Sequence, residues 1–560
     1  MAQRWSIRLH IKIANSVTII LDTERKHRFM SFEVKANIIR EEIKSYTQES
    51  LVSYFIRYLH YKPDNENNAE RRPWIAFLAL EWALELTPCR NPEVATDKQA
   101  HQILEDIWNI QSEASDITNN KNFRIVLRKM IIPQLRFQTH HIQHLFFLFR
   151  FYSMLMQPSA SSVPKEDFNR ITGIKFERFL LFSALLQMVF TWNQSPVIKF
   201  QELVEYMCPY FSFEELRDLL NLVGGNIYEI ESLIKKNRSE KRIIKRDEYF
   251  EEPFLIQKPV LIIPDGITTP HSTVLSIGIS EFILRILKQA DPSRFKDKFT
   301  SSFERYLEEL LIEFKHRFLT EANIKSIYKE NKIAGKVVDF IVAEKDKTLL
   351  IDAKGAEPKS RVLVTDNPRI LRDQIRDIHL KGVEQVSKCI QLLDSIRNNN
   401  IKEYKNRYAL IVTHQNYYIG DCCDLLEYLI PEHSQKLKRT INDMLPPENI
   451  HFCAIDDLEG IVHICKETCT SMCEFLSFCT KQQKSPDTRK FDMRQHILEF
   501  TAMHKLENGS PIGSVASKEA KDKIFEELID MMKSNQTYWN KGWIKNQKVF
   551  SGFAFGKKLL

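Results

Sequence analysis

Cysteine is scarce in this sequence: ten residues in 560, with no two of them in a CxxC pair. So low a density excludes a domain built around disulfides, and we expect reduced thiols. Four cysteines lie close together, at Cys465, Cys469, Cys473 and Cys479. Thiolates bind zinc and iron–sulfur clusters, but free cysteine also packs well as a small apolar residue. Without a CxxC pair, the spacing favours a buried helix face over a metal site.

Long apolar runs are also absent. The most apolar stretch, residues 144–156, is interrupted by Arg150 and is too short to span a bilayer. Residues 1–16 lack the continuous apolar core of a signal peptide. We therefore expect a cytoplasmic protein that does not bind a membrane.

The sequence has no large excess of either charge, no internal repeat and no low-complexity segment. Its net charge is +7 and its pI is about 8.7. This mild basic excess permits nucleic-acid binding but does not establish it.

Breaks rich in polar and small residues divide the chain into four expected regions. We expect a mainly helical region over 1–160, a helical or mixed recognition or partner region over 161–290, a third domain over 291–484, and a helical extension over 485–560. The fold class expected from these elements is mixed α/β, with a mainly helical N-terminal half.

The third domain contains two apolar, strand-like runs, 336–343 and 348–354, separated by the charged loop "EKDK". Pairing of Ala343 with Thr348 would place Asp339 opposite Asp352, on the same face as Lys354. Like charges so placed are destabilising. A shared divalent cation explains the pair best, because hard oxygen ligands suit magnesium. A neighbouring lysine can orient a water molecule or stabilise charge on a phosphate.

The order Asp339, then Asp352-Ala-Lys354, resembles the D…(D/E)xK motif of the PD-(D/E)xK nuclease superfamily, which has the restriction-endonuclease-like fold. The chain departs from the common pattern because Val338 replaces the proline and the second acid is Asp. The flanking segments agree with the family's α-β-β-β-α-β core: an amphipathic helix over 303–314, a helix over 381–393, and strands over 407–414 and 450–455.

The resemblance implies a site with named members. Asp339 and Asp352 would bind one or two Mg²⁺ ions, with Mn²⁺ as a substitute, and the carbonyl of Ala353 would be a further ligand. The family often places a metal-associated glutamate on the first helix, where Glu304 or Glu308 could serve; we expect Glu304. Lys354 would position or help deprotonate a water molecule. Gln385 would orient either Lys354 or a water molecule.

The resemblance also implies hydrolysis of DNA phosphodiester bonds, in the manner of restriction or anti-phage defence nucleases. RNA as substrate and a catalytically silent scaffold subunit are the alternatives. A partner protein of a defence system, or a second copy of this chain, is an expected partner. We expect phosphate contacts from the basic residues that follow the hairpin, namely Lys359, Arg361, Arg369, Arg372 and Arg376.

Three other features each have two interpretations. The basic run 235–246 is either a phosphate-contacting arm or a solvated helix end. His140 and His144 have the spacing of metal ligands, but without an accompanying glutamate we favour packed or surface residues. Trp539 and Trp543 could stack on bases, although a C-terminal core anchor is the favoured role.

Overall fold

The computed structural model describes most of the chain between residues 31 and 530. The described ranges are 31–60, 72–117, 123–137, 141–156, 163–192, 195–207, 210–238, 242–313, 317–344, 346–396, 406–441, 445–506 and a few positions over 522–530. His140, Trp539 and Trp543 lie outside these ranges, and the side chain of His144 is not described. No helix in the described ranges is both long and apolar enough to cross a membrane.

The chain divides into two compact units. Unit 1 comprises Met1–Val126 and Ile230–Pro253, and unit 2 comprises Leu127–Glu229 and Phe254–Leu560. Both units are thus built from segments that are separated in sequence. Their bounds do not coincide with the breaks expected at 160, 290 and 484, and the division into four regions stays a prediction.

Unit 1 is helical and is organised around one fully buried helix. Every residue of α4 (Pro73–Glu85) is buried, because its sequence is apolar on all sides apart from two glutamates. The surrounding elements are α2 (Phe32–Lys44), α3 (Gln48–His60), α5 (Asp97–Asn109), α6 (Gln111–Ser115), the end of α13 (Ile227–Asn237) and η2 (Arg246–Phe250).

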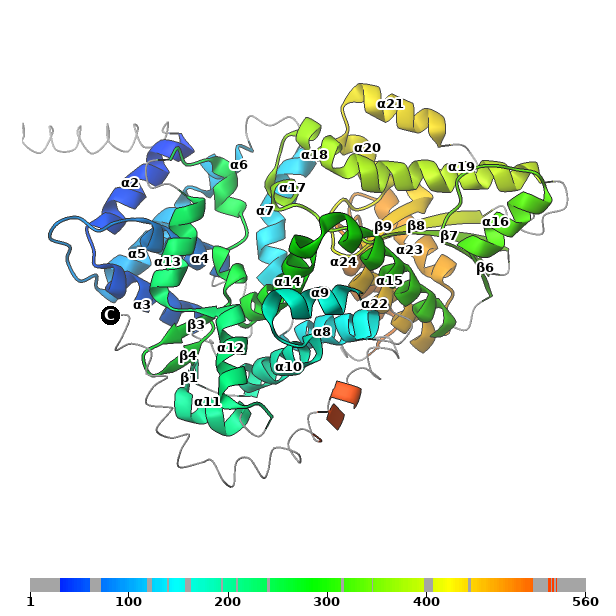
Figure 1. Ribbon diagram of the computed structural model, residues 1–560. Helices are drawn as coiled ribbons and strands as arrows, with labels where there is room; N and C mark the ends of the chain where they lie inside the picture. The colour runs from blue at the N-terminus through cyan, green and yellow to red at the C-terminus, as the bar shows by residue number, and fades with distance from the viewer. Residues whose placement is uncertain are drawn as a thin grey trace, which may run out of the picture. The chain divides into compact units, whose positions relative to one another are not determined.

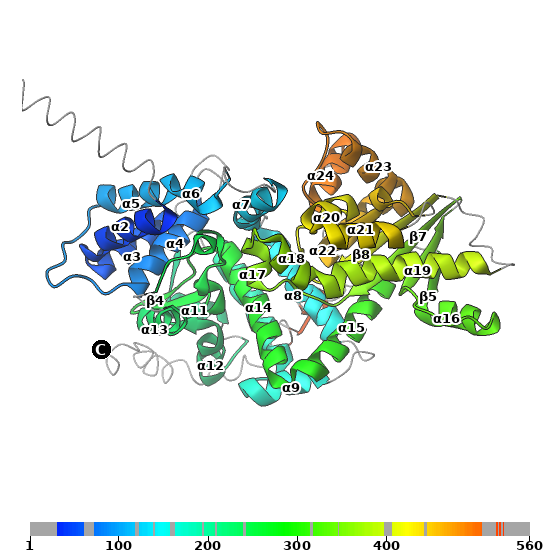
Figure 2. The ribbon, with the colours of Figure 1, turned by 90° about the horizontal axis from the view of Figure 1, so that it is seen from above.

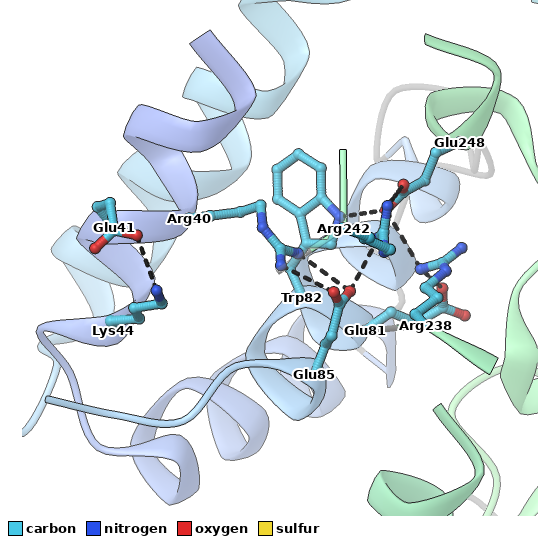
Figure 3. A network of polar contacts seen from close by, with 9 residues as sticks. All are labelled: Arg40, Glu41, Lys44, Glu81, Trp82, Glu85, Arg238, Arg242 and Glu248. Atoms are coloured by element: carbon cyan, nitrogen blue, oxygen red, sulfur yellow. Dashed lines mark hydrogen bonds and ion pairs between the residues drawn. The ribbon is translucent and has the colours of Figure 1, made fainter. Parts of the chain in front are cut away.

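The two glutamates of α4 enter a network of buried charges, drawn in Figure 3. Arg40 binds Glu85 through two hydrogen bonds of 2.8 and 3.1 Å, and Arg242 Nη2 donates to Glu85 Oε2 at 3.0 Å. Arg238 Nη1 donates to Glu81 Oε2 at 3.0 Å. Arg238 and Arg242 of the basic run 235–246 therefore bind buried carboxylates. Neither a phosphate-contacting arm nor a solvated helix end predicts such contacts. Lys236 and Lys245 of the run are exposed.

We expect Glu248→Gln to destabilise unit 1 by about 1–3 kcal/mol at neutral pH, because a neutral amide cannot balance the buried guanidinium groups. Burial alone raises the pKa of Glu248, but Arg242 and Arg238 hold it below its usual value of 4.5. The carboxylate therefore stabilises the fold above about pH 4.5, and this contribution is lost as the pH falls through the folded-state pKa.

Guanidinium unfolding at pH 7 and pH 3.5 tests this expectation. The difference between wild type and Glu248→Gln should be smaller at pH 3.5. The control is Glu251→Gln, since Glu251 also binds Arg238 but is largely exposed. Equal losses in the two variants at pH 7 would contradict the expectation.

Unit 2 combines helices with two small sheets. Its helices before the larger sheet are α7 (Phe123–Phe137, from Leu127 onward), α8 (His141–Met156), α9 (Val163–Thr172), α10 (Phe176–Trp192), α11 (Phe200–Met207), α12 (Phe213–Val223), η3 (Phe254–Gln257), α14 (Ser272–Ala290) and α15 (Pro292–Glu313). The smaller sheet has the order β1 (Val197–Lys199), β4 (Gly266–Thr268), β3 (Val260–Ile263), β2 (Gly224–Gly225).

The larger sheet has five strands in sequential order: β5 (Phe318–Thr320), β6 (Phe340–Glu344), β7 (Lys347–Lys354), β8 (Asn406–Thr413) and β9 (Ile450–Ala454). The ladders β5–β6–β7 are antiparallel and β7–β8–β9 are parallel. The strands of its parallel part, β7, β8 and β9, are buried on both faces over most of their length, as parallel strands covered by helices require.

Helices cover both faces of this sheet (Figures 1 and 2). On one face α19 (Lys381–Ser395) lies against β7, while α15 and α22 (Ile455–Glu467) pack on the other. The remaining elements are α16 (Glu321–Glu330), α17 (Ser360–Val364), α18 (Pro368–Ile375), η4 (Arg376–Leu380), α20 (Cys422–Tyr428), α21 (Pro431–Thr440), η6 (Pro447–Asn449), α23 (Met472–Lys484) and α24 (Met493–Met503).

The hairpin register expected from the sequence is confirmed: Ala343 pairs with Thr348 and Phe340 with Ile351. The expected helices and later strands are also present, as α15, α19, β8 and β9. Two bounds were wrong. Glu344 pairs with Lys347, so the loop is shorter, and β6 begins at Phe340 instead of residue 336. The ladder stops there because the Asp339 carboxylate, and not a main-chain carbonyl, accepts the Ala353 N–H.

The cysteine cluster is mainly a packing feature. Cys465, Cys473 and Cys479 are buried in the apolar core on α22 and α23, whereas Cys469 is exposed. Burial raises the pKa of each of the three buried thiols and keeps them neutral. The expected burial is confirmed for these three and wrong for Cys469, and the three lie on two helices instead of on one helix face.

Candidate active site

Two aspartates lie at the centre of the candidate site. Asp352 is inside β7 and its side chain is completely buried. Asp339 immediately precedes β6, and its Oδ2 accepts a hydrogen bond of 2.6 Å from the Ala353 main-chain N–H. In a strand, the N–H and C=O of one residue point to the same side. The carbonyl of Ala353 is therefore on the side of Asp339, and its role as a ligand stays a prediction.

Lys354 connects the aspartates to helix α19. Its Nζ lies 2.8 Å from Asp352 Oδ2 and donates a hydrogen bond of 3.4 Å to Gln385 Oε1. Gln385 in turn donates from Nε2 to the carbonyl of Val337 at 2.5 Å. The structure therefore brings together Asp352, Lys354 and Gln385 in one chain of polar contacts.

Helix α19 can approach this closely because residue 382 is glycine. A Cβ at Gly382 would lie 3.1 Å from Asp352 Oδ2 and 2.9 Å from the Ile411 side chain. Gly382 thus allows the helix that carries Gln385 to pack directly over the buried carboxylate.

Burial, and to a smaller extent neighbouring charge, raises the pKa values of three acids of the site. Burial, with a smaller contribution from the charge of Asp339, raises the pKa of Glu304 to about 7. Burial raises the pKa of Asp352 to about 7, against the opposing effect of Lys354, and Asp339 and Glu304 add to the rise. The pKa of Asp339 is raised too, chiefly by burial. Glu304 is therefore linked by charge to both aspartates: Asp339 raises the pKa of Glu304, and Glu304 raises the pKa of Asp352.

Glu321 is a residue of this site that the sequence analysis missed. Its charge raises the pKa of both Asp339 and Glu304. It follows directly after β5, a strand of three residues that is too short to give a recognisable pattern. The capping box between Thr320 and Asn323 at the start of α16 is the local signal that could have located it.

The residues of this site fit a divalent cation in chemistry, although their side chains are not gathered around one point. No group of three or more His, Cys, Asp or Glu side chains in the described ranges has the geometry to bind a metal ion. The carboxylates are instead engaged by Lys354 and by the Ala353 N–H. Asp352 Oδ1, however, is buried and accepts no hydrogen bond from the described residues. An orphaned buried carboxylate oxygen is costly and is a position that a cation would satisfy.

The expected phosphate-contacting residues lie beyond the end of β7. Lys359 and Arg361 flank the start of α17, and Arg369 lies in α18; all three are exposed. Arg372 and Arg376 have acidic neighbours, since Arg372 Nε donates to Asp373 at 2.8 Å and Arg376 Nε lies 3.7 Å from Asp377. Three of the five side chains are thus the better placed for phosphate, and the contact role of all five stays a prediction.

Comparison of the chain with protein-family models, with curated proteins and with solved structures gave no match.

Proposed function

We propose that unit 2 is a metal-dependent endonuclease of the PD-(D/E)xK type that hydrolyses phosphodiester bonds in DNA. The observation that carries this proposal is the contact chain Asp352–Lys354–Gln385 beside Asp339, on the sheet and helix where the resemblance expects it. The order of α15, β6, β7, α19 and β8 also agrees with that fold.

A Mg²⁺ or Mn²⁺ ion bound by Asp339, Asp352, Glu304 and the Ala353 carbonyl would polarise the scissile phosphate and acidify a water molecule. Lys354 then has two functions. It balances the charge of Asp352 when no substrate is bound, and its ammonium can hold the attacking water or the non-bridging phosphate oxygens. Gln385 restricts the position of the Lys354 ammonium by accepting a hydrogen bond from it. The Gln385 amide is itself held in place because it donates a hydrogen bond to the carbonyl of Val337.

Defence against foreign DNA, as in restriction systems, is the cellular role that we propose with this activity. Lys359, Arg361 and Arg369 would contact the DNA backbone, which fixes position on the duplex without reading its sequence. A partner protein or a second copy of the chain would then contribute to target choice.

A catalytically silent scaffold is the second candidate. The observation that favours it is the lack of a converged metal-binding group in the described ranges. The two candidates differ in what Lys354 is needed for: chemistry in the nuclease, and only charge balance in the scaffold.

The experiment that separates them uses Lys354→Ala in the full chain. We expect this variant to retard DNA in a gel with Ca²⁺ as wild type does, because phosphate binding is spread over many basic residues. With Mg²⁺ its cleavage rate should fall by about 10²–10³-fold, since the contact with substrate that is removed acts in the transition state. Lys354→Arg should not restore the rate, because a planar guanidinium does not replace a compact ammonium.

The matched control is Lys388→Ala, on the exposed side of α19, which should cleave and bind normally. Simultaneous loss of DNA binding and cleavage in Lys354→Ala, or undiminished cleavage, would refute the assigned role of Lys354.

A further inference from the structure

A buried arginine caps the short helix α17, which follows the hairpin of the candidate site. Arg128 of α7 is completely buried and belongs to unit 2. Its Nη1 donates to the carbonyl of Val362 at 2.6 Å and to the carbonyl of Leu363 at 3.4 Å. Both carbonyls lie in the last turn of α17, where a helix has no further N–H groups of its own to offer. Arg128 therefore supplies the donors that this helix end lacks.

The same guanidinium also binds a second segment. Its Nε and Nη2 donate to the carbonyl of Tyr417, which follows β8, at 3.2 and 2.8 Å. The next residue of α7, Lys129, is completely buried as well, and its Nζ lies 2.6 Å from Asp366 Oδ2, two residues beyond α17. Two adjacent side chains of α7 thus hold the C-terminal side of α17.

The main chain before α17 is anchored too. Glu357 is largely buried; it binds Lys288 of α14, and its Oε1 lies 3.3 Å from His414 Nδ1. Lys359 and Arg361, both exposed, lie between these two groups of contacts. The segment that presents these two cations to solvent is therefore fixed on both sides.

The buried charge of Arg128 has a cost. Its acceptors in the described ranges are main-chain carbonyls, which carry no full negative charge, and burial lowers the pKa of Arg128 to about 10. A buried charge without an opposite charge opposes folding. In return, a segment that is fixed before a ligand binds loses less conformational freedom on binding, and this increases affinity.

We propose that Arg128 is a positioning residue for nucleic-acid binding, which fixes α17 so that Lys359 and Arg361 are ordered for contact with the phosphate backbone. This inference rests on the proposed function. It adds a residue of α7, outside the D…DxK motif and the helices that flank it.

The affinity of the full-length protein for a fluorescent DNA duplex, measured by anisotropy in Ca²⁺ at several salt concentrations, tests this. We expect Arg128→Met to weaken binding about tenfold, and to reduce the slope of log K against log salt by about one to two. The decisive comparison is the same substitution in the double variant Lys359→Ala, Arg361→Ala. There it should weaken binding little further, because the contacts that Arg128 positions are already gone.

Two further variants serve as controls. Arg305 Nη2 likewise donates to carbonyls in the last turn of a helix, those of Ser153 and Met154 in α8, so Arg305→Met should keep the wild-type affinity and slope. Arg128→Lys keeps the buried charge, but a compact ammonium cannot replace a fork that binds two segments, so we expect a partial loss of affinity. Thermal melting shows which variants are folded, and Arg128→Lys takes the place of Arg128→Met in the comparison if the latter is not.

The other outcomes separate this inference from the proposed function. Wild-type affinity and slope in Arg128→Met would overturn the inference and leave the proposed function intact. An equal loss of affinity with and without Lys359 and Arg361 would make Arg128 a purely structural residue and overturn the inference as well. Failure of the wild type to bind DNA would overturn both, whereas DNA binding without cleavage in Mg²⁺ would overturn the nuclease alone.

Discussion

Asp352→Asn should abolish DNA cleavage while making the metal-free protein more stable. The lost carboxylate removes a metal ligand, a contribution of several kcal/mol to the transition state and thus about a thousandfold or more in rate. The gain in stability follows from burial: Asp352 is completely buried and its pKa is raised to about 7, so its charged form opposes folding.

The sign of the stability effect depends on pH. An acid whose pKa is raised in the folded state favours folding only while it is protonated, and that advantage is lost as the pH rises from about 4 to about 7. Above pH 7 the neutral asparagine should therefore raise the free energy of unfolding, on the order of 1–3 kcal/mol. Below pH 4 the protonation of Asp352 should cause little difference in stability between the wild type and Asp352→Asn.

Thermal melting at pH 4 and pH 8 with EDTA, together with plasmid cleavage in Mg²⁺, measures both effects. Asp346→Asn is the matched control, because it makes the same chemical change at the exposed turn of the same hairpin. Undiminished cleavage by Asp352→Asn would remove this residue from the site, and lower stability at pH 8 would contradict the assigned cost of its buried charge.

Arg150→Met should be among the most destabilising single substitutions in unit 2, at about 3–5 kcal/mol. Arg150 lies on α8 and binds Glu459 of α22 through hydrogen bonds of 2.8 and 2.7 Å, with both side chains buried. Tyr306 of α15 also donates to Glu459, at 2.6 Å. Removing the guanidinium leaves a carboxylate in the core with one neutral donor.

A double variant separates the ion pair from simple loss of packing. Arg150→Met combined with Glu459→Met leaves no unpaired buried charge, so it should recover part of the lost stability in denaturant unfolding. The control, Arg170→Met, breaks a surface pair with Asp167 and should cost at most about 1 kcal/mol. A double variant less stable than Arg150→Met would contradict a buried ion pair as the cause.

Arg150 also indicates why contacts between distant segments could not be predicted from the sequence. In the sequence it is a break in an apolar run, and its partner lies 309 residues away. Lys129 is similar: it is buried and binds Asp366 at 2.6 Å. Such contacts place the helical segment from Leu127 onward in the same unit as the candidate site. We therefore expect a fragment that begins at Pro292 to lose its fold.

The central hairpin could be predicted because its information is local. Alternating apolar residues and one charged loop fixed the register. Asp339 lies just beyond the last pair, where its side chain accepts a hydrogen bond from the Ala353 N–H instead of pairing opposite Asp352. The resemblance led to Gln385 and Glu304. Gln385 accepts a hydrogen bond from Lys354, and the charge of Glu304 raises the pKa of Asp352. Glu321 was missed because its place depends on a three-residue strand that exists only by pairing with β6.

The most direct test of the central claim is incubation of the full-length wild type with plasmid, linear DNA and RNA, in Mg²⁺, Mn²⁺ or EDTA. We expect cleavage of DNA in Mg²⁺ or Mn²⁺ and none in EDTA, with Asp352→Asn inactive under all conditions. Cleavage of RNA alone would change the substrate and keep the site. Cleavage that persists in EDTA or in Asp352→Asn, or no cleavage of any nucleic acid by the wild type, would contradict a metal-dependent nuclease at Asp339, Asp352 and Lys354.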